Sequence, residues 1–334
     1  MMTLAHFWAA VVALTILLYV VLDGFDLGVG ALFGFTRDEM QRREMLAAIA
    51  PVWDGNETWL VLAGSALFAA FPMVYALLLS ALYLPLSFML VALILRGVAF
   101  EFRHNAGPRM RKVWDVGFAG GSIVAAFVQG ATVGALVYGI PVGAGGRFAG
   151  HGALDWLTPF SVLCGVALCL GYTLLGAGWL VLKGEGEIRE RGYRLLPRLL
   201  IAVLALLACI FVISLWQHLS VMDRWIQRPW LAVFPLIASI GIAALLVGVR
   251  RRRDRLPFAG ATLLFVVAFA MFAASFLPYM VPFSITIDQA AAPHSSLAFI
   301  FWGAGVVILP LIVLYAVTVY TVFRGKAAPS TEYH

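Results

Sequence analysis

The chain has 334 residues, of which 63% are hydrophobic and only 12% are charged. A soluble domain carries about a quarter charged residues, and the mean hydropathy of +0.96 lies far on the apolar side. The composition therefore excludes an ordinary soluble protein and indicates a polytopic membrane protein.

Nine mostly apolar stretches are long enough to cross a bilayer, which takes about 20 residues of α-helix. In chain order they cover residues 5–35, 51–71, 73–102, 114–139, 156–182, 195–216, 230–249, 257–281 and 297–323. The second and third stretches are separated by a tight reversal at Pro72. We therefore expect an all-α protein in which residues 1–334 form a single integral membrane domain.

The basic residues alternate strongly between the two sides of these predicted spans. Eighteen of the 23 Lys and Arg residues lie in the connections after spans one, three, five and seven and in the C-terminal tail, and three lie in the other connections. Cytoplasmic loops are enriched in Lys and Arg. The pattern predicts an outside N-terminus and a cytoplasmic C-terminus. It also accounts for the formal net charge of +6 without a nucleic-acid partner.

The first span contains two carboxylates, Asp23 and Asp26, in the segment "LDGFDLGVG". Asp23 lies 14 residues before Arg37, or about 21 Å along a helix. This depth is well inside the hydrocarbon, where a carboxylate faces protein or water, finds a partner or holds a proton. The alternative is that the span ends near Leu22 and the acidic segment is an inner loop.

A second polar cluster opens the second span in "APVWDGNETWLVLAG". It contains Asp54, Asn56 and Glu57 together with the tryptophans Trp53 and Trp59. Acidic residues in a first helical turn cap free N–H groups and complement the helix dipole. One cap needs only one such residue, so a functional site and a cap are both open interpretations.

The third cluster is "LRGVAFEFR", with Arg96 inside the third span and Glu101 nearer its end. Arg96 lies seven residues before Arg103, or about 10 Å inside the boundary. Its side chain either extends to that boundary or pairs with a carboxylate. Three or four acids and one base thus share the inner half of the first three spans, as in a proton or ion path.

The remaining spans carry little polarity at depth. Gln129 and Thr132 of the fourth span are expected to make interhelical hydrogen bonds. The three cysteines lie in apolar segments without a CxxC spacing, and we expect no metal site. The histidines fall at span ends, in connections or in the tail, so the sequence predicts no haem ligand in this chain. They are His6, His104, His151, His218, His294 and His334.

The order and spacing of four motifs resemble subunit II of the bacterial cytochrome bd quinol oxidases. The motifs are "LDGFDLGVG", "APVWDGNETWLVLAGSALFAAFPMVY", "LRGVAFEFR" and "FLPYMVPFSITIDQAAAPHSSL". The resemblance covers essentially the whole chain. The short length and compact loops are similar to the cyanide-insensitive branch of that family.

The resemblance implies two four-helix bundles and one extra peripheral helix in the bacterial cytoplasmic (inner) membrane. It implies a heterodimer with subunit I, which carries two haems b and one haem d, oxidises quinol and reduces oxygen to water. Subunit II would ligate no haem and would help supply protons from the cytoplasm. Some members also hold a structural quinone. The resemblance specifies neither the quinol nor a small accessory subunit.

The acidic path residues of the family correspond here to Asp23 and Asp54, and its membrane arginine to Arg96. Glu101 stands where many relatives have Asp, so a carboxylate is kept but its reach differs. We hypothesise that Asp23 is a protonatable relay and that Asp26 pairs with Arg96. Three glycines, Gly24, Gly28 and Gly30, would allow close helix approach to subunit I or a neighbouring span.

Two other functions use the same acids. A proton- or ion-coupled transporter would need a midplane substrate site, often with broken helices in both halves, and the second half of this chain offers no deep polar residues for one. A scaffold would use the acids only to hold spans one to three together.

Overall fold

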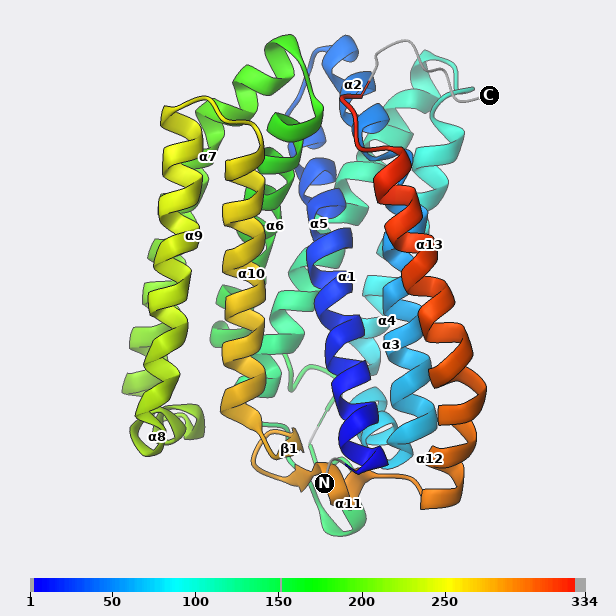
Figure 1. Ribbon diagram of the computed structural model, residues 1–334, viewed down its shortest axis with the longest axis vertical. Coiled ribbons are helices and arrows are strands. Elements are labelled where there is room, and N and C mark those ends of the chain that lie inside the picture. Colours follow the sequence, from blue (N-terminus) through cyan, green and yellow to red (C-terminus); the bar gives the residue numbers. More distant parts are fainter. Residues whose placement is uncertain (1–2, 151, 328–334) are drawn as a thin grey trace.

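The computed structural model describes residues 3–150 and 152–327, which form a bundle of long helices running between two ends (Figure 1). Eight helical segments in this described part are long and apolar enough to cross a membrane. They are α1 (Leu4–Gly34), α4 (Pro72–Phe102), α5 (Pro108–Tyr138), α6 (Pro159–Lys183), α7 (Gly186–Trp216), Pro229–Arg250 with α9 (Val233–Arg250), α10 (Arg255–Phe276) and His294–Val322.

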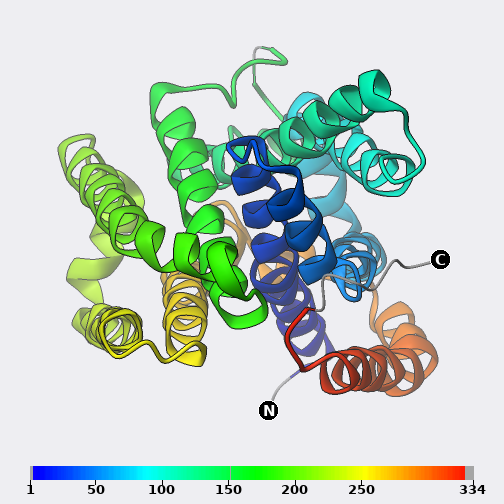
Figure 2. The same cartoon turned by 90° about the horizontal axis from the view of Figure 1, so that it is seen from above.

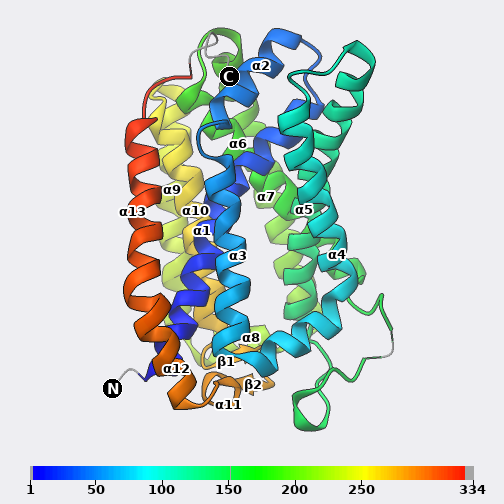
Figure 3. The ribbon, with the colours of Figure 1, turned by 90° about the vertical axis from the view of Figure 1, so that its right-hand side faces the viewer.

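The second predicted span, residues 51–71, corresponds to α3 (Trp53–Ala70) and is the one of the nine that is absent from these eight segments. Its 18 residues run beside α1 and α4 (Figure 3), but its polar first two turns keep it outside the apolar set. The last segment, His294–Val322, consists of α12 (His294–Ile300), a π-helical stretch (Phe301–Ile308) and α13 (Leu309–Val322). It lies at the edge of the bundle when seen along the helices (Figure 2).

Short elements close the two ends of the bundle. The helix α2 (Glu39–Ile49) lies at the end that also holds the last turn of α13, and the N-terminal end of α1 lies at the other (Figure 1). That other end carries α8 (Ser220–Gln227), two 3-10 turns (Ala144–Gly146 and Pro229–Ala232), the antiparallel strands β1 (Tyr279–Val281) and β2 (Ile285–Thr286), and α11 (Ile287–Ala290). The connections that carry most of the Lys and Arg residues lie at the α2 end, between α4 and α5, between α6 and α7 and between α9 and α10 (Figure 1).

The observed helix boundaries have local causes. Proline occupies the first turn of α4, α5 and α6, where its missing N–H is unpaired in any helix. The helices α5 and α7 begin six and nine residues before the predicted spans because polar first turns continue them beyond the apolar stretch. The eighth span ends earlier than predicted, at Phe276, two residues before Pro278.

The helix α1 runs without a break through the acidic segment 23–30. The alternative that this segment forms an inner loop is therefore wrong. The three glycines of the segment lie against α5 and α6. A Cβ atom at Gly28 would stand 1.8 Å from the Tyr172 carbonyl oxygen, and one at Gly30 would stand 2.0 Å from Ser122 Oγ. The ring of Tyr172 covers Gly24, so the close approach is to neighbouring spans of the same chain.

An ion network holds α2 against the ends of α4 and α5. Arg103 contacts Asp115 at 2.5 Å and Glu39 at 2.9 Å, while Arg42 reaches the same Asp115 at 2.6 Å. Burial alone would raise the pKa of the Glu39 carboxyl, but the guanidinium of Arg103, with help from Arg111 and Arg43, holds that pKa below its ordinary value. The network thus fixes the position of α2 at the end of the bundle toward which α1 continues beyond its acids.

Substitution of Gly28 by Val should separate α1 from α6. The added side chain meets backbone atoms of Tyr172 and Gly176, which cannot rotate away. We therefore expect the free energy of unfolding to fall by about 1–3 kcal/mol or more. Thermal unfolding of the purified complex measures this effect. The control is Gly120→Ala on α5, where an added Cβ meets nothing within 4 Å. Equal melting temperatures for Gly28→Val and Gly120→Ala would contradict the packing described here.

Candidate functional site

A buried polar cluster lies where α1, α3 and α4 meet. Its centre is the guanidinium of Arg96 on α4, which is 1% exposed. Arg96 Nη2 lies 2.8 Å from Asp23 Oδ1 and 3.1 Å from Glu57 Oε2. Asp23 is fully buried and lies eleven residues before the end of α1, or roughly 16 Å along its axis. The single cation of Arg96 therefore forms ion pairs with two carboxylates, one from α1 and one from α3.

The predicted pairing of Asp26 with Arg96 is wrong. Asp26 Oδ2 instead accepts a hydrogen bond of 2.7 Å from Asn56 Nδ2, and Arg96 is taken by Asp23 and Glu57. The physical reason is the helical spacing. Asp23 and Asp26 are three residues apart, so they lie one turn from each other along α1. Only one of them reaches the level of the guanidinium.

Three of the residues that open α3 join this cluster. Asn56 binds Asp26, Glu57 binds Arg96, and the ring of Trp53 lies 6.0 Å from the Arg96 guanidinium carbon. The N-cap position of α3 is Val52, and it provides no side-chain capping hydrogen bond. The α3 start is thus organised around the charges of α1 and α4 and less around its own first N–H groups.

Asp54 and Glu101, which the sequence predicts as path residues, lie outside the buried cluster. Both side chains are exposed. Asp54 stands in the first turn of α3, three residues before Glu57, and Glu101 stands near the end of α4. Within the part of the chain that the structure describes, neither carboxylate forms an ion pair with Arg96.

Four further residues surround the cluster: Gln129, Tyr19, Tyr172 and Tyr320. The sequence predicts a role, in hydrogen bonding between helices, for Gln129 alone among them. Gln129 of α5 donates to the Tyr19 hydroxyl at 2.8 Å and accepts from the Tyr172 hydroxyl at 2.7 Å. The expectation that Gln129 makes interhelical hydrogen bonds is confirmed. Tyr320 of α13 donates to Asn56 Oδ1 at 2.8 Å. Tyrosines are common in apolar spans, so nothing in their spacing singles out these three.

The side chains that commonly bind metal ions are scattered in the described part of the chain. In 3–150 and 152–327, no group of three His, Cys, Asp or Glu side chains could hold a metal ion. His6 lies in the first turn of α1, His218 follows the end of α7, and His294 opens α12. His104 lies just beyond the end of α4, whereas His151 and His334 are outside the described residues.

The family model described as "Cytochrome bd terminal oxidase subunit II" matches residues 4–323. The chain belongs to this family. It is 31% identical to "Cytochrome bd ubiquinol oxidase subunit 2" of Bacillus subtilis over 98% of both chains. It is 30% identical to "Cytochrome bd-I ubiquinol oxidase subunit 2" of Escherichia coli K12, covering 97% of this chain and 95% of the relative.

The fold agrees with this membership in the cytochrome bd family. The structure of bd oxidase from Geobacillus thermodenitrificans matches with a TM-score of 0.77 at 18% identity, covering 96% of this chain and 99% of that chain. The chain is thus a multi-pass membrane protein and a subunit of a cytochrome bd-type terminal quinol oxidase. The complex contains haem and a subunit I partner. Membership decides against the transporter alternative.

Replacement of Arg96 by Met should destabilise this cytochrome bd subunit. The substitution leaves Asp23 buried without its cation, and an uncompensated buried charge costs about 3–5 kcal/mol. The double variant Arg96→Met/Asp23→Asn should recover part of that loss because it also removes the charge. Denaturant unfolding of the purified complex measures the free energy of unfolding of the wild type, of the single variants Arg96→Met and Asp23→Asn, and of the double variant.

The matched control is Arg198→Met, because Arg198 is an exposed arginine of α7. We expect it to change stability little. The outcome that would contradict the ion pair is simple additivity. In that case the loss of stability in the double variant equals the sum of the losses in Arg96→Met and Asp23→Asn, and the two side chains are energetically independent.

Proposed function

We propose that this chain supports quinol oxidation and the reduction of oxygen to water by the haem-bearing subunit I, and that it provides a proton-uptake path from the cytoplasm. The observation that carries the proposal is the buried arrangement of Asp23, Glu57 and Arg96 inside a membrane bundle. Ionisable groups at such depth are rare in membrane helices and mark ion paths and proton relays.

The proposed path begins at the basic end of the bundle. Asp54 is exposed in the first turn of α3, and Glu57 follows three residues later, so the two carboxylates are neighbours on the helix. Glu57 is itself 30% exposed and contacts Arg96, which contacts the fully buried Asp23. The acids thus lead from the surface into the cluster, and the guanidinium of Arg96, which keeps its own proton, holds Glu57 and Asp23 near each other.

Glu101 would be a second surface acid on this path. It lies five residues beyond Arg96 on α4, which is roughly 7 Å further toward the same end. Its exposed side chain would take up protons from the cytoplasm and pass them toward Asp54 or Glu57. Its role is less direct than that of Asp23 because it has no contact with Arg96.

The chemistry of the complex requires such a supply. Reduction of oxygen to water consumes protons, and protons taken from the cytoplasm add to the membrane potential. We assign the two haems b and the haem d to subunit I, as the family resemblance implies; the described histidines of this chain lie at helix ends or in connections. A structural quinone in this chain and a small accessory subunit are further features of some members of the family.

The orientation follows from the charges of the bundle ends. We place the α2 end, which carries the basic connections and the last turn of α13, in the cytoplasm of a bacterial cell, and the N-terminal end outside. The first helices, α1 and α3–α5, and the later helices, α6, α7, α9 and α10, would be the two bundles, with His294–Val322 as the peripheral helix.

Substitution of Asp23 by Asn in the assembled oxidase tests the proposal. Arg96 keeps Glu57 as a partner, so we expect the haem spectrum to be unchanged while quinol-driven oxygen consumption falls about tenfold or more, because a positioned proton-transfer group is lost. Charge separation in proteoliposomes should fall in parallel. Asp223→Asn, which changes an exposed acid of α8, is the control. Wild-type turnover and charge separation in Asp23→Asn, with haem intact, would refute the relay.

A further inference from the structure

Three buried or half-buried acids surround a single cation, and they do not share it equally. Arg96 forms ion pairs with Asp23 and Glu57. Asp26 is 1% exposed and forms no ion pair with any residue in 3–150 and 152–327. A buried carboxylate without a cation is strongly unfavourable in its charged form. Of the three acids, Asp26 is therefore the one whose surroundings suit the neutral, protonated form.

The orientation of the Asn56 amide identifies the oxygen that would carry this proton. Asn56 Nδ2 donates to the Leu22 carbonyl at 3.2 Å and to Asp26 Oδ2 at 2.7 Å. A carbonyl oxygen only accepts, so Leu22 keeps the nitrogen directed at α1. The Tyr320 hydroxyl donates to Asn56 Oδ1 from the other side at 2.8 Å. The amide cannot rotate by half a turn without losing these bonds.

Asp26 Oδ2 is thus held as an acceptor, and a proton on Asp26 must reside on Oδ1. That atom is buried and has no hydrogen-bond partner among the described residues. It is the one polar atom of Asp26 that is free to exchange a proton with a neighbouring acid or a water molecule. One turn earlier on α1, Asp23 Oδ2 is likewise buried and without a partner.

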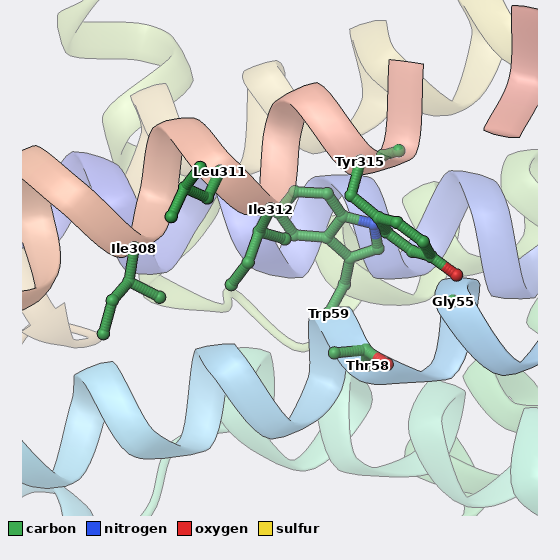
Figure 4. Close-up of a pocket in the computed structure, with 8 residues that line it drawn as sticks. Gly55, Thr58, Trp59, Ile308, Leu311, Ile312 and Tyr315 are labelled. Atoms are coloured by element: carbon green, nitrogen blue, oxygen red, sulfur yellow. The ribbon is translucent and has the colours of Figure 1, made fainter. Parts of the chain in front are cut away.

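Tyr320 comes from a helix that packs loosely on the bundle. No residue of α13 is buried, and an apolar cavity of about 240 Å³ separates α13 from α3. Figure 4 shows Trp59 of α3 and Ile308, Ile312 and Tyr315 of the last segment around this cavity. Tyr320 nevertheless reaches the core, where its ring meets that of Trp179 edge to face at 6.4 Å, and its hydroxyl is the polar contact between α13 and the cluster.

Two lysines fix the end of α13 just beyond Tyr320. Lys183 Nζ, at the end of α6, donates to the carbonyls of Phe323 and Gly325. Lys326 Nζ donates in return to the carbonyls of Val181 and Gly184 at 3.1 Å. Each lysine thus binds the carbonyl oxygens at the end of the other helix.

A salt bridge strengthens this attachment. Lys326 Nζ lies 2.8 Å from Asp254, which Arg189 and Tyr193 also contact. Burial alone would raise the pKa of the Asp254 carboxyl, but Arg189, Lys326 and Tyr193 hold it well below its usual range. The salt bridge is therefore present at neutral pH, and α13 remains anchored with Tyr320 facing Asn56.

We propose that Asp26 is the acid of this cluster that carries the proton, on Oδ1, and that Asn56 and Tyr320 are positioning residues that keep Oδ2 as an acceptor. The part of Asp26 in turnover rests on the proposed proton-uptake function. The location of the proton itself does not, and it can be measured without turnover.

Infrared difference spectroscopy of the purified oxidase, in H2O and in D2O, tests the location of the proton. The wild type should show the C=O band of a protonated buried carboxyl group. The band should disappear in Asp26→Asn and persist in Asp23→Asn. Loss of the band in Asp23→Asn with its persistence in Asp26→Asn would overturn the proposal, and so would a wild-type band that neither substitution removes.

Tyr320→Phe tests the positioning role because it removes only the hydroxyl group. The carboxyl band should shift in frequency, since Asn56 is no longer held in one orientation against Asp26 Oδ2. The control is Tyr315→Phe on the same helix, whose exposed side chain lines the cavity and should leave the band unchanged. An unchanged band in Tyr320→Phe, or the same shift in both variants, would overturn the positioning role.

Oxygen consumption separates this inference from the function on which it rests. We expect Asp26→Asn to lower turnover about tenfold or more and Tyr320→Phe to lower it less. If the infrared assignment holds while Asp26→Asn and Asp23→Asn both turn over at the wild-type rate, the proton is on Asp26 but the proton-uptake function is wrong. If turnover falls in both variants while the band follows Asp23, the function holds and the assignment to Asp26 is wrong.

Discussion

The guanidinium of Arg96 is the charge on which the arrangement of the first helices depends. It is buried on α4 and contacts Asp23 of α1 and Glu57 of α3. An apolar bundle stabilises such a cation only when acids meet it at hydrogen-bonding distance. The three helices must therefore take one relative position, and the remaining polar groups follow from it. Asn56 faces Asp26, and Trp53 lies beside the guanidinium.

The glycines of α1 make this arrangement sterically feasible. Gly28 lies against the backbone of Tyr172, and Gly30 lies against Ser122, so α1 approaches α5 and α6 more closely than any larger residue would permit. Apolar helices in a bilayer gain little from the hydrophobic effect on association, because lipid is as apolar as their side chains. Close packing on one side of α1 and an ion pair on the other together determine its position. The acids thereby lie inside the protein and away from lipid.

The α2 end of the bundle is held differently from its middle. At the α2 end, Arg103, Asp115 and Glu39 connect α2, α4 and α5, and the reciprocal contacts of Lys183 and Lys326 attach the last helix. The buried charges of both networks have local partners: Arg103 pairs with Asp115, and Lys183 binds backbone carbonyls. In the middle of the bundle, polar groups are few and most of them have a defined partner. Asp26 Oδ1 is an exception, because it is buried without a hydrogen-bond partner among the described residues. It is on this oxygen that we propose the exchangeable proton resides.

The sequence by itself determined the membrane class, the order of the helices and the concentration of acids in the first third. These properties depend on composition and on spacing along one helix, which a linear pattern records. It left Arg96 two possibilities, to extend to the membrane boundary or to pair with a carboxylate. Only the tertiary structure decided that the partners are Asp23 and Glu57 instead of Asp26, and that Tyr320, 264 residues away from Asn56, completes the cluster. Two acids one helical turn apart have nearly the same depth in the sequence pattern. The position of α1 along its axis, which its glycine contacts with α5 and α6 help to set, selects which of them lies level with the cation.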